Sequence, residues 1–287
     1  MPLINAEEWA KSTKNKNELE FRQAVHTVLV AVSNSAFLNQ RMYMKGGILL
    51  SLIYNGIRHT RDIDFSTTNE VTGFDEDEFL TEFNHNLANA VESLTYGLDC
   101  RIQSHEMRPP ATAGHTHPTY KLKIGYAYKI NDKKHKRLLN GVCPTVVEVD
   151  YSFNEPNYEH TEEIQLDNGG HILVYSLIDL VAEKLRSILQ QEVRNRVRRQ
   201  DAYDLYCLLK DVGQLSNEQY QKIIDSLMLK AKARDLKLDR NSINNPEIIK
   251  RSELEYNQLG NEIEGELPDF NMVYKCVSDF YTSLPWS

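Results

Sequence analysis

The chain has 287 residues, of which 41% are hydrophobic and 26% charged, and its formal net charge at pH 7 is -8. This length exceeds a usual domain of roughly 100–200 residues, so we expect two modest domains or one domain with a large appendage. No segment approaches the roughly 18 unbroken apolar residues of a membrane helix, and the N-terminus shows no signal peptide, so we expect a soluble, cytoplasmic protein. The negative charge argues against a protein that coats nucleic acid without specificity.

Cysteines and basic residues add two smaller constraints. The four cysteines lie far apart without a Cys-x-x-Cys pair, which argues against a zinc knuckle or a disulfide framework and predicts reduced packing residues. Two basic stripes lie at residues 133–137 and 194–199. Each is either a solvated loop or helix face, or a surface that attracts a polyanion.

The first half of the chain predicts a mixed sheet with helices. Apolar residues at helical spacing indicate one helix over residues 18–35 and a second that begins near Gly46 and ends at Asn55-Gly56. Residues 62–65 alternate polar and apolar, as in a half-buried strand, so Asp62 and Asp64 share one face. A helix is then expected over 75–94, followed by strands over 98–107, 120–130 and 146–153.

After about residue 175 the apolar period changes from two to about 3.6, and only helices are expected. Ser176 to Asp179 resemble a capping box, with a short acid in place of glutamate, before a helix that runs to Gln190. Further helices are predicted over 199–212, 217–234, 246–259 and 269–284. The expected fold class is α+β, with an α/β domain over residues 1–175 and a helical domain over residues 176–287.

Two short motifs in the first half carry the chemistry. Nucleotidyl transfer uses two divalent cations about 3.5–4 Å apart, and the carboxylates of Asp62 and Asp64 are hard oxygen ligands that suit Mg²⁺, with Mn²⁺ as a substitute. Gly46 and Gly47 precede a predicted helix, where their backbone can approach a triphosphate and present free amides. Either motif alone is common, whereas their combination in this order is specific.

The run Lys45-Gly46-Gly47-Ile48-Leu49-Leu50, followed by Arg58-His59-Thr60-Arg61-Asp62-Ile63-Asp64-Phe65, resembles the first motif of the AbiEii family of nucleotidyltransferases. These proteins are the toxins of type IV toxin–antitoxin systems, and the resemblance covers roughly residues 20–212. It implies a nucleotidyltransferase-like sheet, a nucleoside triphosphate substrate and a two-metal Mg²⁺ site. It also implies an RNA acceptor such as a tRNA 3′ end, and a cognate antitoxin.

The resemblance also assigns later residues. A third metal ligand is expected at Asp150, which we favour over Glu148 because of the D-x-S-F context that follows. Lys184 matches the family's lysine after the sheet and would hold the triphosphate, or is instead a helix-surface lysine. Asp201 would orient Lys184 or position the acceptor, with Asp204 a weaker candidate; pairing of Asp201 with Arg198 is the alternative.

Arg58 and Arg61 flank the Asp-x-Asp motif and are interpreted as phosphate contacts, with a salt bridge as the alternative for either. The predicted catalytic residues are therefore Asp62, Asp64, Lys184 and Asp201, and Asp62, Asp64 and Asp150 are the predicted metal ligands. Two other functions remain open. The same site can modify a protein hydroxyl, or it can bind nucleotide or RNA without turnover in a regulatory module.

Overall fold

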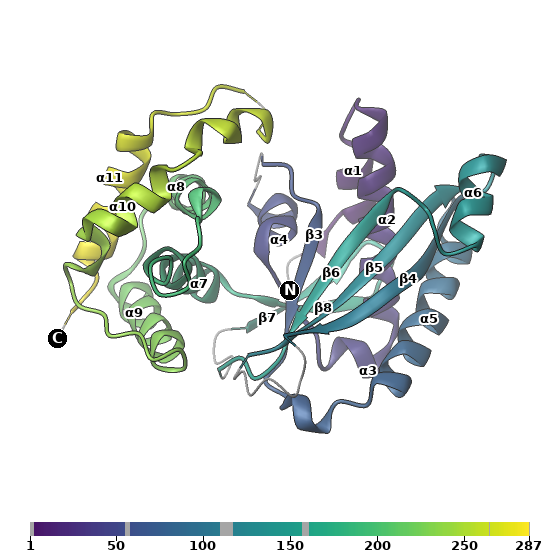
Figure 1. The fold of residues 1–287 in the computed structure, drawn as a ribbon, viewed down its shortest axis with the longest axis horizontal. Coiled ribbons are helices and arrows are strands. Elements are labelled where there is room, and N and C mark those ends of the chain that lie inside the picture. Colours follow the sequence, from purple (N-terminus) through teal and green to yellow (C-terminus); the bar gives the residue numbers. More distant parts are fainter. Residues whose placement is uncertain (1–2, 55–57, 110–116, 157–160, 264, 287) are drawn as a thin grey trace. The chain divides into compact units, whose positions relative to one another are not determined.

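The computed structural model describes residues 3–54, 58–109, 117–156, 161–263 and 265–286, which form two compact units (Figure 1). The first unit comprises Met1–Ile48, Arg61–Asn157 and Thr161–Val174. The second comprises Leu49–Thr60, Tyr158–His160 and Tyr175–Ser287. A short segment from the N-terminal half, Leu49–Thr60, therefore belongs to the same unit as the C-terminal helices.

The first unit is built on a mixed sheet. The described strands form one eight-stranded sheet in the order β1-β7-β8-β2-β3-β6-β5-β4. The strands are β1 (Leu3–Ile4), β2 (Tyr43–Lys45), β3 (Asp62–Ser66), β4 (Leu98–Arg108), β5 (Thr119–Tyr128), β6 (Val146–Ser152), β7 (Thr161–Leu166) and β8 (His171–Tyr175). β3 pairs parallel with β6, whereas β5 is antiparallel to both β4 and β6.

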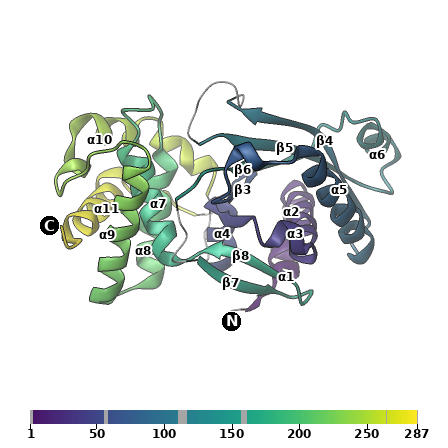
Figure 2. The ribbon, with the colours of Figure 1, turned by 90° about the horizontal axis from the view of Figure 1, so that it is seen from below.

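Two long helices of the first unit, α2 (Lys16–Asn34) and α5 (Glu76–Ser93), pack side by side and against β4 (Figures 1 and 2). Their apolar stripes explain this packing, since α2 buries Phe21, Val28 and Leu29 and α5 buries its phenylalanines and Leu87. The shorter helices are α1 (Ala6–Lys11), α3 (Ala36–Asn39), α6 (Asp132–Leu139) and the 3₁₀ turn η1 (Val71–Gly73). The helix α4 (Gly46–Ile53) begins in the first unit and ends in the second.

The second unit is helical in its described part. Its helices are α7 (Leu177–Leu189), α8 (Arg199–Val212), α9 (Asn217–Lys232), α10 (Pro246–Glu253) and α11 (Phe270–Ser283), with 3₁₀ turns η3 (Ser242–Asn244) and η4 (Tyr256–Asn261). Helix α7 packs against both α8 and α9, and α11 packs against α8 (Figure 2). In the described residues, no helix combines the length and apolar character that crossing a membrane requires.

The predicted α+β class is confirmed, and most predicted elements appear within a few residues of their expected bounds. The predicted helix over 246–259 is wrong, because α10 ends at Glu253 and Glu255 adopts a left-handed conformation with φ 61°. The segment continues as a 3₁₀ turn instead. The strands β2, β7 and β8 were not predicted, and the expected helix break at Asn55-Gly56 lies outside the described residues.

Helix α7 shows only half of the predicted capping box. The Ser176 hydroxyl accepts a hydrogen bond from the backbone N–H of Asp179 at 3.3 Å. The Asp179 carboxylate does not return the contact, because its Oδ1 accepts from Ser226 at 2.8 Å and pairs with Lys230 Nζ at 3.1 Å. Asp179 and Lys230 are 2% and 1% exposed, so this ion pair joins α7 to α9 in the interior of the second unit.

Replacing Lys230 with methionine is expected to lower the free energy of unfolding by roughly 3–5 kcal/mol, because the buried carboxylate of Asp179 loses its counter-charge. Urea titration of the purified variant measures this loss. Lys232 is the matched control, since it lies exposed on the same helix and its replacement with methionine should be nearly neutral. Equal stability of the two variants would contradict the role given to the pair.

Candidate functional site

Four carboxylates share one face of the sheet where β3 pairs with β6. The parallel register places Asp62 beside Glu148 and Asp64 beside Asp150. Because side chains alternate along a strand, Asp62 and Asp64 point to one face, and their neighbours on β6 point to the same face. All four are partly exposed, whereas Ile63 and Val149 between them are fully buried. The predicted Asp-x-Asp geometry is thus present.

Two lysines of β5 compensate part of this negative charge. Lys121 lies opposite Asp150 in the antiparallel register, and its Nζ donates to both carboxylate oxygens of Asp150 at 2.8 Å. Lys123 lies opposite Glu148, with 3.6 Å between Nζ and Oε1. The favoured third ligand, Asp150, is therefore held by an ammonium group.

The glycine pair lies against the carboxylate of Asp64. Gly46 is the first residue of α4 and has φ +80°, a conformation that residues with a side chain rarely adopt. A Cβ placed on Gly46 would lie 2.0 Å from Oδ2 of Asp64. Lys45, just before it, extends its ammonium to within 3.5 Å of Oε1 of the buried Glu155. Glycine at position 46 therefore lets the start of the helix reach the carboxylate face.

The donor set of this face fits a magnesium ion, although it forms no closed cage. Within the described residues, no group of three or more His, Cys, Asp or Glu side chains is gathered closely enough to hold a metal. Magnesium is commonly held by one or two carboxylates and completes its shell with water and substrate phosphates. Asp62 and Asp64 supply such oxygens on one face, and Asp150 lies beside Asp64 in the register, in contact with Lys121.

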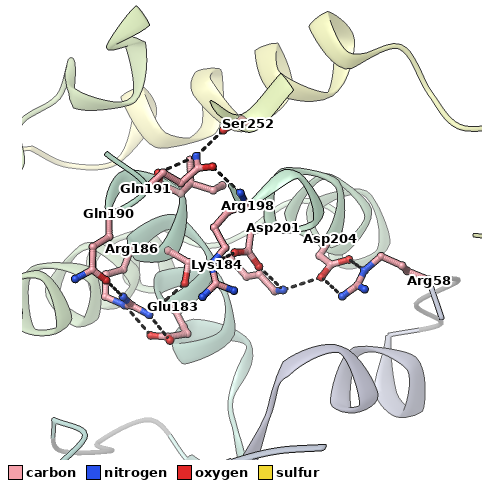
Figure 3. A network of polar contacts seen from close by, with 12 residues as sticks. Arg58, Glu183, Lys184, Arg186, Gln190, Gln191, Arg198, Asp201, Asp204 and Ser252 are labelled. Atoms are coloured by element: carbon pink, nitrogen blue, oxygen red, sulfur yellow. Dashed lines mark hydrogen bonds and ion pairs between the residues drawn. The ribbon is translucent and has the colours of Figure 1, made fainter. Parts of the chain in front are cut away.

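A buried polar network in the second unit contains the other predicted residues (Figure 3). Lys184 of α7 donates to Oδ1 of Asp201 at 2.8 Å and to Oδ2 of Asp204 at 2.7 Å. Both acids lie on α8, three residues apart, and all three side chains are at least nine-tenths buried. Lys184 is therefore not a helix-surface lysine, and Asp204 contacts it as closely as Asp201 does.

Arg58 completes the network and adopts the predicted salt bridge. Its Nε and Nη2 donate to the two oxygens of Asp204 at 2.9 and 3.1 Å, which is a bidentate pair. Its neighbour His59 donates its backbone N–H to the carbonyl of Glu262 at 2.6 Å. Arg61, by contrast, belongs to the first unit and is exposed. The alternative contact, Arg198 with Asp201, is long at 3.9 Å.

The charges of this network stabilise one another. Burial alone would raise the pKa of Asp204, but the neighbouring Lys184 and Arg58 cations lower the pKa to about 2. Burial likewise disfavours the charged form of Lys184, yet Asp201 and Asp204 raise its pKa above the usual range. Lys184 and Asp204 therefore both stay charged near neutral pH.

The structure divides the predicted site residues between two groups, and the sequence misses several of their partners. Asp62, Asp64, Asp150, Gly46, Gly47 and Arg61 lie in the first unit, and Arg58, Lys184 and Asp201 lie in the second. The contact of Lys121 with Asp150 was not predicted, because it depends on the register of β5 against β6. The sequence indicated a salt bridge as the alternative for Arg58 but did not identify Asp204 as the partner.

Two carboxylates on one strand, with a glycine-led helix start against them, are typical of nucleotidyltransferases. A family model described as "Nucleotidyl transferase AbiEii toxin, Type IV TA system" matches residues 27–280. The chain belongs to this family and is a nucleotidyltransferase of the toxin type, as the resemblance of its first motif indicated. The match also extends well beyond residue 212 and includes most of the C-terminal helices, for which the sequence alone offered no motif.

The other comparisons add less. No curated protein matches the sequence closely enough to count as a relative. Nine chains of solved structures match the fold. One is the crystal structure of a "putative nucleotidyltransferase from H. pylori", with 15% identity, a TM-score of 0.44, and coverage of 92% of this chain and 98% of that chain.

Replacing Gly46 with alanine is expected to destabilise the protein by roughly 1–3 kcal/mol, because the new Cβ meets the Asp64 carboxylate and the residue keeps a positive φ. The free energy of unfolding in urea measures this effect. Gly73→Ala is the control, since a Cβ at Gly73 has no neighbour within 4 Å. The close approach at Gly46 is refuted if both variants are as stable as the wild type.

Asp204 is expected to make stability sensitive to acid. Its pKa is about 2 in the folded protein and 3.8 in the reference state, a difference of nearly two units. A lowered pKa gives stability that is complete above about pH 5 and is lost as the pH falls from about 4 to 2, about 2 kcal/mol in all. When the pH falls from 6 to 3, the free energy of unfolding in urea should decrease by about 1 kcal/mol less for Asp204→Asn than for the wild type.

The control for this pH dependence is Asp225→Asn, an exposed acid on α9. That variant should follow the wild type from pH 6 to pH 3. If Asp204→Asn loses as much free energy of unfolding as the wild type between pH 6 and pH 3, Lys184 and Arg58 do not stabilise the ionised form of Asp204.

Proposed function

We propose that this nucleotidyltransferase moves a nucleoside monophosphate from a nucleoside triphosphate to a hydroxyl of an RNA, such as a tRNA 3′ end, in a magnesium-dependent reaction. The observation that carries the proposal is the single carboxylate face formed by Asp62 and Asp64 on β3 beside Asp150 on β6. Family membership supports the triphosphate substrate, the toxin role and an antitoxin partner. The RNA acceptor and the metal are the proposed part.

The residues of the first unit have distinct tasks in this proposal. Asp62 and Asp64 hold the divalent cation, which neutralises charge on the triphosphate and favours attack by the acceptor hydroxyl. Mn²⁺ can substitute because it accepts the same oxygen ligands. Gly46 lets the start of α4 lie against Asp64, where a side chain would intrude, and the backbone amides of Gly46 and Gly47 would face the phosphates.

Lys121 and Asp150 form an exchangeable pair in this proposal. Both are partly exposed, with 31% and 21% of their side-chain surface accessible, so the contact between them is not locked in the interior. Asp150 would be available to a divalent cation if this contact exchanged, and the ammonium of Lys121 would then remain on the same face. It can then contact a phosphate oxygen, since a lysine binds phosphate as a point charge.

Roles for Lys184 and Asp201 in nucleotide transfer remain part of the proposal, with Lys184 as a phosphate-binding group. Their mutual hydrogen bond and burial also make them part of the core of the second unit. Removal of either charge is expected to destabilise this unit, so activity alone does not separate the two roles. Lys184→Arg keeps the charge, and a variant that folds as the wild type but fails to transfer nucleotide would assign a catalytic role.

The decisive prediction concerns the carboxylate face. Asp62→Asn and Asp64→Asn should each lower transfer from α-³²P-labelled nucleoside triphosphates to total tRNA by roughly a thousandfold, since several kcal/mol of charge stabilisation are lost. Asp77→Asn, which changes an exposed acid of α5, should leave transfer unchanged. Normal transfer by Asp62→Asn would contradict the proposed site.

The same assay separates the remaining alternatives. Loss of transfer in Asp150→Asn but not in Glu148→Gln would assign the third ligand to Asp150, and the reverse result would assign it to Glu148. Label on protein rather than RNA would favour protein modification. Tight triphosphate binding without transfer to any acceptor, equal in wild type and Asp62→Ala, would favour a regulatory module.

A further inference from the structure

A second concentration of positive charge lies in the turn between α7 and α8, far along the chain from the carboxylate motif. This arginine turn comprises residues 190–198, and a small hollow is formed there by seven residues. Four of the seven are arginines, namely Arg186, Arg194, Arg196 and Arg198. All of them belong to the second unit.

Two of these four arginines have an acidic partner in the protein, since Arg186 pairs with Glu183 and Arg198 lies 3.9 Å from Asp201. Arg186 is paired with Glu183, with Nε and Nη2 at 3.1 and 2.5 Å from the two carboxylate oxygens. Within the part of the chain that the structure describes, neither Arg194 nor Arg196 forms an ion pair, and both are exposed. The carboxylate of the turn itself, Glu192, accepts a hydrogen bond from Asn245.

The arginines also repel one another. Burial lowers the pKa of Arg194, and the neighbouring guanidinium groups of Arg196, Arg186, Arg234 and Arg198 lower it further. An arginine does not lose its proton in water near neutral pH, so this repulsion persists in the folded protein. An anion at the turn would relieve it.

The backbone of the turn is fixed from inside (Figure 3). The side chain of Gln191, which is 1% exposed, accepts from the backbone N–H of Arg198 at 2.7 Å and donates to Ser252 Oγ at 2.8 Å. The backbone N–H groups of Arg194 and Arg196 donate to the carbonyls of Gln190 and Gln191 at 3.1 and 3.0 Å. The guanidinium groups are thus presented by an ordered turn, which lowers the entropy lost on binding.

The shape of the site distinguishes between anions. The hollow has room for about 10 Å³, which suits one water molecule or one phosphate oxygen but not a nucleobase or a triphosphate. Arg194 and Arg196, which line the hollow, are exposed, and Arg198 is partly exposed. Several guanidinium groups at one turn suit the repeated charges of a phosphodiester strand, because each can bind phosphate oxygens in a bidentate manner.

We propose that Arg194, Arg196 and Arg198 bind the phosphodiester backbone of the RNA acceptor at the arginine turn. The identity of the polyanion as the acceptor rests on the proposed function, whereas the binding site rests on the turn itself. Because the whole chain carries a net charge of -8, this local cluster also directs a polyanion to one part of the surface. Contacts to the backbone position a strand and carry no base preference.

The test is the salt dependence of RNA binding, followed by fluorescence anisotropy with a labelled single-stranded RNA and the full-length protein. Replacing both Arg194 and Arg196 with glutamine should weaken binding roughly tenfold at low salt. It should also lower the slope of log K against log salt by about 1.4, or about 0.7 for each lost phosphate contact. Arg194→Lys/Arg196→Lys keeps the charge and should retain the slope.

The matched control is Lys136→Gln/Arg137→Gln on α6, which removes the same charge from two exposed residues of the other basic stripe. This variant should bind RNA as the wild type does. An unchanged slope in the Arg194/Arg196 variant, or an equal loss in the α6 variant, would overturn the proposal. Circular dichroism and thermal unfolding verify that each variant is folded.

Two competitors separate other ligands of the same chemistry. Inorganic triphosphate that displaces RNA through the same arginines at equal affinity would indicate a small-anion site and contradict the proposal. Poly-glutamate that binds as tightly as RNA would indicate an acidic protein surface and also contradict it. The anisotropy assay measures binding without nucleotide transfer. If the proposed function is wrong, RNA will still bind at the arginine turn but will not be labelled in the transfer assay.

Discussion

The parallel pairing of β3 with β6 is the constraint on which the functional site depends. It places Asp62, Asp64, Glu148 and Asp150 on one face of the sheet, in adjacent positions. Four carboxylates this close repel one another unless cations balance them. Lys121 and Lys123 on β5 supply part of that balance. In the proposed reaction a divalent cation would bind to the same face.

The second unit meets its own charge problem with internal partners. Lys184, Asp201, Asp204 and Arg58 form a buried network, and Lys230 pairs with Asp179 between α7 and α9. Burying such groups is costly unless each charge has partners with good geometry, so the network constrains how α7 and α8 pack. Beside this neutralised interior, the arginine turn keeps charge at the surface. Among the described residues, Arg194 and Arg196 form no ion pair, and this contrast with the paired interior is the basis of the proposed binding surface.

Sequence patterns predicted the local features of the fold well. The alternation in Asp62 to Phe65 located β3, and apolar spacing located α2, α5 and the C-terminal helices within a few residues. The pattern failed for short elements such as β2, which has three residues, too few for a period to emerge. It also failed at Glu255, where a left-handed residue ends a helix that the apolar spacing alone would continue.

In the candidate site, too, the sequence predicts some features and misses others. The Asp-x-Asp motif and the glycine pair are contiguous, so the sequence identifies them directly, and family membership supports their assignment. Partners that meet only through strand register or helix packing, such as Lys121 with Asp150 and Arg58 with Asp204, cannot be predicted from the spacing of residues in the sequence.

The central claim is that Asp62 and Asp64 bind a divalent cation together with a triphosphate. Calorimetric titration with Mn²⁺ in the presence of an unreactive triphosphate analogue tests it most directly. The account predicts that Asp64→Asn weakens Mn²⁺ binding more than tenfold. Lys121→Met, which removes the ammonium group that contacts Asp150, should not weaken Mn²⁺ binding. An unchanged Mn²⁺ affinity in Asp64→Asn would contradict the central claim.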